Sequence, residues 1–122
     1  MFINLSNHPS ARWEKEQILA AMDFGEIVDI QFPSIPPEFD TQEVYNIADT
    51  YYHKCINLLP VSSSLHAIHI AGEPVFCFHI ITKLLCAGYN VITSTTERMV
   101  KETADGQKIS VFNFIKFRKY EL

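Results

Sequence analysis

The feature that most constrains the fold is the order of the expected elements, because strand-like and helix-like segments alternate three times before the C-terminal region. Such alternation is typical of a parallel sheet whose crossover helices cover its faces through right-handed connections. Strands are expected at 2–5, 26–32, 65–71 and 89–93, and helices at 12–24, 40–58 and 74–87. This order predicts an α/β fold, a Rossmann-like three-layer sandwich with a mostly parallel sheet, in a single domain over residues 1–122.

The segment that follows Asp40 carries the clearest helix signal. Asp40 can cap the helix, and Glu43, three residues later, completes a capping box. The apolar side chains recur at close to the helical period and predict one buried face: Val44, Ile47, Ala48, Tyr51, Cys55 and Leu58. The preceding stretch PSIPPEFD contains three prolines, so we expect a loop there.

The third expected helix, 74–87, is apolar on almost every side. Pro74 lies in its first turn and Gly88 lies just past its end, as is common at helix termini. A helix without a polar face has to be covered on two sides, so we expect a second subunit to supply part of that cover. The three cysteines show no CxxC spacing, and we expect reduced, buried thiols.

The C-terminal region departs from the strand–helix alternation. Residues 99–103 and 108–120 flank an Asp105-Gly106 pair, which is typical of a hairpin turn. The second of these segments, KISVFNFIKFRKY, is rich in β-branched and aromatic residues. The sequence therefore predicts a C-terminal β-hairpin at one edge of the sheet.

The composition excludes some classes of protein. The chain has 122 residues with a formal net charge of −4 at pH 7, whereas a protein that coats long nucleic acid normally needs a basic surface. A small nucleotide held by a few local groups is compatible with this charge. The longest apolar stretch, 74–81, is too short to span a bilayer, and the N-terminus lacks a secretion-signal pattern. We therefore expect a cytoplasmic protein with no membrane partner.

Polar residues gather where the four expected strands end. In an open α/β sheet, ligands bind beyond the carboxyl ends of the strands. We therefore expect one substrate-binding site lined by Ser6, Asn7 and His8, by Pro33 and Ser34, by Gly72 and Glu73, and by Ser94, Thr95, Thr96, Glu97 and Arg98.

The stretch SNHPS suggests acid–base chemistry and phosphate binding. His8 can give or take a proton near neutral pH, or bond a phosphate. Ser6 and Ser10 can cap the first helix, whose N-terminus attracts phosphate. A turn histidine with a local bond and simple capping serines are the alternative interpretation.

Two further segments have candidate functions and structural alternatives. Gly72 would let a ligand approach the backbone closely. Glu73 would accept a hydrogen bond from a ribose hydroxyl, although the helix dipole alone also favours an acidic residue in the first turn. In the stretch STTER, Thr95 and Thr96 would bond phosphate or adenine, and Arg98 would stabilise a pentavalent phosphate. A surface pair of Glu97 and Arg98 is the alternative.

The remaining histidines give no sign of a metal site. His66 and His69 lie three residues apart on an expected strand, so they face opposite sides. His79 is expected to be a hydrogen-bonded core or interface residue within the apolar helix. We expect no bound metal and no other cofactor, because no known metal-ligand spacing occurs.

Three segments carry a resemblance to a known family: FINLSNHPSARWEKEQ, HIAGEPVFCFHIITKLLCAGYNVITSTTER and KISVFNFIKFRKYEL. In size, element order and the placing of these segments, the chain resembles small stand-alone CRISPR-associated proteins with a Rossmann-like fold related to the CARF domain. Several of those proteins are ring nucleases of antiviral defence. They bind cyclic oligoadenylates, the second messengers of type III CRISPR systems, and cleave them.

The resemblance implies a homodimer that binds the cyclic ligand across its two-fold axis and cleaves it without a metal. In such enzymes the ribose 2′-hydroxyl attacks the adjacent phosphate and leaves a 2′,3′-cyclic phosphate. Carried over to this sequence, the resemblance assigns His8 as general acid or base and Arg98 as oxyanion stabiliser. The residues that would hold phosphate or base are Ser6, Asn7, Ser10, Thr95 and Thr96.

Three other functions stay open at the level of the sequence. The protein would be a non-catalytic sensor if it binds the same cyclic oligonucleotide and passes the signal on or sequesters it. It would be a small interaction domain if it has no nucleotide ligand. It would be a mononucleotide- or nucleoside-processing enzyme if Glu73 or Glu97 is a nucleophile.

Overall fold

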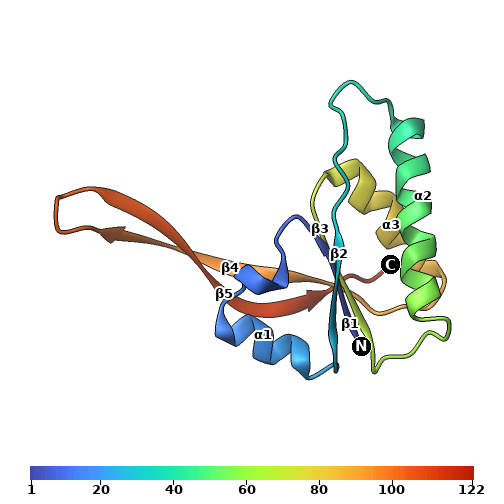
Figure 1. Cartoon of the computed structure of the whole chain (residues 1–122), viewed down its shortest axis with the longest axis horizontal. Coiled ribbons are helices and arrows are strands. Elements are labelled where there is room, and N and C mark those ends of the chain that lie inside the picture. Colours follow the sequence, from blue (N-terminus) through green and yellow to red (C-terminus); the bar gives the residue numbers. More distant parts are fainter.

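A computed structural model describes all residues, 1–122, and contains one five-stranded sheet with the strand order β2-β1-β3-β4-β5 (Figure 1). The elements follow one another as β1 (Phe2–Ser6), a 3-10 turn (Ser10–Arg12), α1 (Lys15–Met22), β2 (Ile27–Gln31), α2 (Thr41–Leu58), β3 (Ala67–Ala71), α3 (Pro74–Cys86), β4 (Val91–Glu102) and β5 (Lys108–Lys119). Strands β2, β1, β3 and β4 pair in parallel, and β5 pairs antiparallel to β4. The expected Rossmann-like α/β sandwich with a C-terminal hairpin is confirmed.

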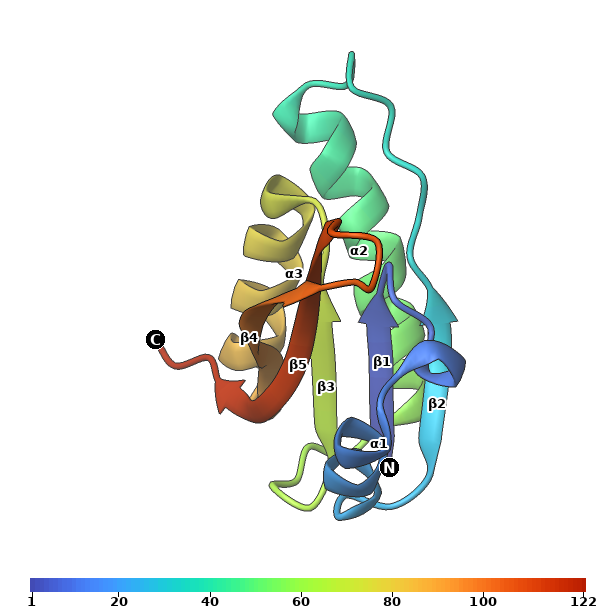
Figure 2. The ribbon, with the colours of Figure 1, turned by 90° about the vertical axis from the view of Figure 1, so that its left-hand side faces the viewer.

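The helices cover the two faces of the sheet unequally. Helices α2 and α3 lie side by side on one face, and α1 lies on the other (Figures 1 and 2). The main core lies under α2 and α3 and contains Ile3, Leu5, Ile68, Ile70, Phe76, Ile80 and Leu84, all almost fully buried. A smaller core under α1 is built around Phe2, Ala21, Ala67 and Ile92. The short α1 leaves part of its face of the sheet without a helix.

The first helical segment begins later than the sequence predicts. The expected helix from 12 to 24 is a 3-10 turn at Ser10–Arg12, then two extended residues, then α1 from Lys15. The side chain of Trp13, in this extended segment, makes two contacts. Its indole nitrogen donates to the His8 carbonyl oxygen at 3.0 Å, and its ring packs edge-on against Phe2 at 5.8 Å.

Strand β4 is far longer than the sequence predicts, and the expected end near Thr93 is wrong. It pairs with β3 only at Val91 and Ile92, then continues to Glu102 as the partner of β5 alone. The β4–β5 ribbon projects away from the sheet on the side opposite α2 and α3 (Figure 1). The stretch STTER therefore lies inside a strand, because the antiparallel ladder with β5 satisfies its backbone groups after the contact with β3 ends.

The apolar third helix and the cysteines differ in part from expectation. One side of α3 faces the core, while Phe78 on the other side is 65% exposed. Cys55 is buried, and burial raises the pKa of its thiol to about 12. Cys86, however, is exposed, so the expectation that all three thiols are buried is wrong. No helix of the structure combines the length and the apolar character that crossing a bilayer requires.

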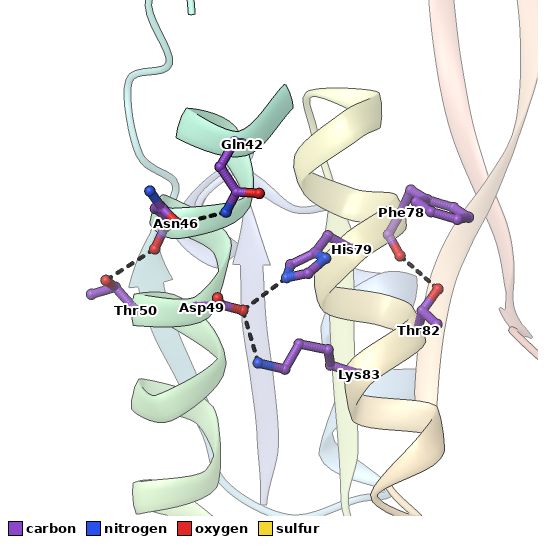
Figure 3. Close-up of polar contacts among 8 residues, drawn as sticks. All are labelled: Gln42, Asn46, Asp49, Thr50, Phe78, His79, Thr82 and Lys83. Atoms are coloured by element: carbon purple, nitrogen blue, oxygen red, sulfur yellow. Dashed lines mark hydrogen bonds and ion pairs between the residues drawn. The ribbon is translucent and has the colours of Figure 1, made fainter. Parts of the chain in front are cut away.

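A polar cluster on the outer surface joins α2 to α3. One Asp49 carboxylate oxygen lies 2.8 Å from both His79 Nε2 and Lys83 Nζ (Figure 3). The Tyr45 ring stacks on His79 with a centroid separation of 3.9 Å. The hydrogen bond from Lys83, followed by that from His79, lowers the pKa of Asp49. His79 is thus hydrogen-bonded, as expected, at a helix–helix contact, and α2 carries the capping box expected at Asp40 and Glu43.

We expect Asp49→Asn to lower the free energy of unfolding by less than about 1 kcal/mol, because exposed ion pairs contribute little. Urea denaturation near neutral pH measures the change. Glu38→Gln serves as the matched control, since Glu38 is an exposed acid outside any ion pair of the structure. A loss of several kcal/mol in Asp49→Asn would show that the contact between α2 and α3 depends on this carboxylate.

Candidate functional site

The face of the sheet under α1 changes from apolar to polar along the strands. Side chains alternate between the two faces, so Phe2 and Asn4 lie on the same face of β1. Phe2 stands in register with Ile27 and Ala67, and α1 covers this level of the sheet. At the next level, toward the carboxyl ends of the strands, the residues in register are polar: Asp29, Asn4 and His69.

These three side chains and Ser94 form one continuous chain of hydrogen bonds, here called the polar row. Asn4 Nδ2 donates to Asp29 Oδ1 at 2.7 Å. Asn4 Oδ1 lies 2.9 Å from His69 Nδ1. On its other side, His69 Nε2 lies 3.2 Å from Ser94 Oγ. The row therefore crosses four strands, β2, β1, β3 and β4.

The polar row is buried at its centre and open at its ends. Asn4 is 1% and His69 is 2% exposed, whereas Asp29 is exposed and Ser94 is partly exposed. Every buried side-chain nitrogen and oxygen atom of the protein has a hydrogen-bond partner. Because an unpaired buried polar group costs about 1–3 kcal/mol, this full pairing makes the row compatible with a stable sheet.

The opening stretch SNHPS is held onto the polar row by its backbone. The His8 carbonyl oxygen accepts from Asn4 Nδ2 at 3.0 Å, from Trp13 Nε1 at 3.0 Å and from Ser6 Oγ at 3.1 Å. Ser10 Oγ donates to Asp29 Oδ2 at 2.6 Å. Ser10 thus binds a side chain of the neighbouring strand, and no side-chain hydrogen bond caps the turn that it begins.

The surroundings of the polar row shift two pKa values. Burial lowers the pKa of His69 from 6.5 to about 4, and the charge of nearby His8 adds to this effect. His69 is therefore neutral at pH 7. Partial burial alone would raise the pKa of Asp29, but hydrogen bonds from Ser10 and Asn4 outweigh it and lower the pKa. Asp29 is therefore a carboxylate at pH 7.

Two clefts open beside the polar row at the carboxyl edge of the sheet. The large cleft, of about 780 Å³, lies between the SNHPS loop, the end of β2 and the loop after it, and its polar lining includes Ser6, Asn7, Arg12, Asp29 and Glu73. The small cleft, of about 230 Å³, lies between the SNHPS loop and the part of the β4–β5 ribbon nearest the sheet. Its lining includes His8, Arg12, His69, Ser94 and Thr96. Arg12 lines both clefts.

Seven of the sequence-predicted residues and neighbours at the strand ends line these clefts, together with Thr96. Ser6, Asn7 and Glu73 line the large cleft, together with Pro33 and Ser34. His8, Ser94 and Thr96 line the small cleft. The Glu73 side chain also caps α3 by accepting from the Phe76 backbone N–H at 2.7 Å.

Other predicted residues on the ribbon line neither cleft, although Arg98 stands opposite Phe112 of the small cleft in the ladder. Arg98 is exposed, and its guanidinium donates to Ser110 Oγ at 3.0 and 3.2 Å. Glu97 stands opposite Asn113 in the ladder, and Thr95 Oγ1 donates to the Lys116 carbonyl oxygen at 3.0 Å. Within one chain, no cavity is shared by His8 and Arg98.

Sequence reasoning missed four residues of this site: Asn4, Arg12, Asp29 and His69. Asn4 and Asp29 each interrupt a short apolar strand at a position that faces α1, and that alternation was the available signal. His69 could not be recognised from its spacing, because its partners lie on other strands. His66 lies apart from it and contacts the N-terminal nitrogen of Met1 at 2.8 Å. No group of three possible metal ligands occurs in the structure.

Gly72 is needed for packing within the protein. A Cβ atom at this position would overlap the Phe32 ring. That ring packs against Phe76 with a centroid separation of 4.9 Å, so it is part of the boundary between the large cleft and the main core. The close approach to Gly72 is therefore made by Phe32.

We expect Gly72→Ala to lower the free energy of unfolding by about 1–3 kcal/mol, the usual cost of overpacking. Urea denaturation measures the loss. The same substitution in a Phe32→Leu background should cost clearly less, because the smaller side chain leaves room for the methyl group. An equal cost in both backgrounds would contradict the proposed clash.

His69 should make the stability depend on pH. Its pKa is about 4 in the fold and 6.5 in the unfolded chain, so the unfolded chain binds the extra proton between these values. The stabilisation is fully present above pH 6.5 and is lost as the pH falls toward 4. The difference corresponds to about 3 kcal/mol at most.

Urea denaturation between pH 7 and pH 4 measures this dependence. In His69→Gln the part of the slope due to this residue should disappear. His53→Gln, which changes an exposed histidine, should keep the wild-type slope. If His69→Gln and wild type lose stability in parallel, His69 is not the neutral buried group described here.

Comparison with known proteins identifies the family. A model of the uncharacterized protein MJ1673 family matches residues 1–118, which include the polar row and the lining of both clefts. No curated protein and no solved structure gives a significant match to the chain. Because the match extends from β1 almost to the end of β5, the chain belongs to the uncharacterized protein MJ1673 family.

Proposed function

We propose that this protein binds cyclic oligoadenylate at the carboxyl edge of its sheet and cleaves it as a metal-independent ring nuclease. The observation that carries the proposal is the position of Arg12, which lines both clefts and shares the small one with His8. A guanidinium and an imidazole that line one cleft suit a phosphodiester. The resemblance of the sequence to small CRISPR-associated ring nucleases points to the same class of ligand.

The charges of the clefts suggest how the ligand would lie. Two carboxylates, those of Asp29 and Glu73, line the large cleft and would repel a phosphate there. The same cleft offers the amide of Asn7 and the hydroxyl of Ser34, which suit a nucleoside. We therefore place a scissile phosphate at Arg12, between the clefts, and the adenosine attached through its 5′-oxygen in the large cleft.

The proposed reaction follows from this placement. The ribose 2′-hydroxyl attacks the adjacent phosphorus, the bond to the 5′-oxygen of the next nucleotide breaks, and a 2′,3′-cyclic phosphate remains. His8, when protonated, donates to the leaving 5′-oxygen. Arg12 stabilises the negative charge of the transition state, the role that the sequence resemblance assigns to Arg98. Arg98 would take part only if the expected homodimer brings it to the second subunit's cleft.

The test is incubation of the protein with cyclic tetra-adenylate in a metal chelator, followed by chromatography of the products. We expect a linear product with a 2′,3′-cyclic phosphate. His8→Ala should slow cleavage by about 100-fold or more, because general acids contribute on that scale. Arg12→Gln should slow it as well, whereas Arg98→Gln is the matched control on the ribbon.

Two other outcomes would replace this proposal. Uncut ligand that co-elutes with the protein would identify a non-catalytic sensor, the alternative that the sequence leaves open. If cyclic oligoadenylates of several ring sizes leave the melting temperature unchanged, the protein does not bind them, because a ligand specific for the folded state must raise it. The proposed setting of the reaction is the cytoplasm.

A further inference from the structure

The polar row has a fixed direction of hydrogen bonding, and this direction can be followed atom by atom. Asn4 Nδ2 lies at 2.7 Å from Asp29 Oδ1 and at 3.0 Å from the His8 carbonyl oxygen. Both oxygens can only accept hydrogen bonds, because one belongs to a backbone carbonyl group and the other to the ionised carboxylate of Asp29. The Asn4 amide nitrogen must therefore face them, and the amide oxygen Oδ1 must face His69.

The orientation of Asn4 determines the tautomer of His69. Asn4 Oδ1 can only accept, so His69 Nδ1, at 2.9 Å, must carry the proton of the neutral ring. His69 Nε2 then presents a lone pair to Ser94 Oγ at 3.2 Å. Ser94 donates its hydroxyl proton to this nitrogen. Asp29 and Asn4 thus act as positioning residues, since they determine which ring nitrogen of His69 is the acceptor.

Ser94 is left with acceptor capacity alone. Its one proton is directed to His69, so its oxygen lone pairs face the small cleft, which both residues line. A phosphate oxygen at Ser94 would have to take that proton, which would leave the buried His69 Nε2 without a partner. The group that fits against Ser94 is therefore a hydrogen-bond donor.

We propose that Ser94 accepts a hydrogen bond from a ribose 2′-hydroxyl, and that His69 is the proton acceptor behind it; this inference rests on the proposed function. The 2′-hydroxyl is favoured over the adenine amino group because Arg12 and His8 line the same small cleft. A donor beside Ser94 must then lie next to a phosphate, as the 2′-hydroxyl does in a ribonucleotide.

The proton transfer completes the reaction given above. The 2′-hydroxyl passes its proton to Ser94 Oγ as Ser94 passes its own proton to His69 Nε2. The 2′-oxygen forms a bond to phosphorus, and the leaving 5′-oxygen takes a proton from His8. His69 ends protonated and His8 ends neutral, so one proton is moved from one histidine to the other and no further reactant is needed.

The first experiment measures the tautomer without any ligand. Nitrogen-15 NMR of the full chain, labelled at histidine, distinguishes a protonated from an unprotonated ring nitrogen. We expect His69 to carry its proton on Nδ1, with the Nε2 signal of an unprotonated nitrogen, at pH 7. A proton on Nε2 would overturn the inference, because Ser94 would then be free to donate to the ligand.

The second experiment compares cyclic tetra-adenylate with its counterpart built from 2′-deoxyadenosine, by equilibrium binding to the catalytically slowed His8→Ala protein. We expect the ribose ring to bind about five- to tenfold more tightly, the value of one neutral hydrogen bond. Ser94→Ala in that background should remove the preference for the ribose ring. Ser94→Thr should keep it. Thr95→Ala, whose hydroxyl is bonded to the Lys116 backbone, is the matched control.

The outcomes separate the two proposals. Equal affinity for both rings, or a preference that persists in Ser94→Ala, would overturn the inference and leave the proposed function standing. Binding of neither ring to the wild-type protein would overturn the proposed function together with the inference. In His69→Gln, with the intact ribose ring, cleavage should slow more than binding weakens. A purely structural role would predict the opposite.

Discussion

The candidate site depends on the two hydrogen bonds that the side-chain amide of Asn4 makes with Asp29 and His69. This amide lies in the middle strand of a three-strand register and joins a carboxylate on β2 to an imidazole on β3. A slip of one residue between any of these strands would turn the polar groups to the opposite, apolar face, where they would lack partners. The same hydrogen bonds therefore select the register of the sheet and orient His69 toward Ser94.

The two faces of the sheet differ in composition: one forms the main core, and the other carries the polar row. The face under α2 and α3 is apolar on β1, β2 and β3, and its packing accounts for most of the buried side chains. The opposite face is apolar only where the eight-residue α1 covers it. Beyond that level the strands bear polar side chains, and the SNHPS loop and the ribbon enclose them. A short helix on one side of the sheet thus leaves room for a site without weakening the core on the other.

The sequence predicted the architecture well because its signals are local. The alternation of elements, the capping box at Asp40 and the turn at Asp105-Gly106 each depend on a few neighbouring residues. It predicted the location of the candidate site from a general property of parallel sheets, and His8, Glu73 and Ser94 line the clefts there. It missed His69 because the hydrogen-bond partners of this side chain, Asn4 and Ser94, lie on other strands, and the sequence alone does not say which strands are neighbours. It ended β4 too early because most of β4 pairs only with β5, a strand that comes later in the chain, and this pairing leaves no local signal in β4 itself.

The β4–β5 ribbon has a mechanical consequence for the site. Its far part touches no other element, but its base supplies Ser94, Thr96, Phe112 and Phe114 to the wall of the small cleft. The bulge between Thr95 and Thr96 lies at that base, where the pairing register shifts and the strand twists more strongly. A force applied to the distant tip would therefore be transmitted along the two paired strands to this wall, and the ribbon would bend at the bulge near Ser94.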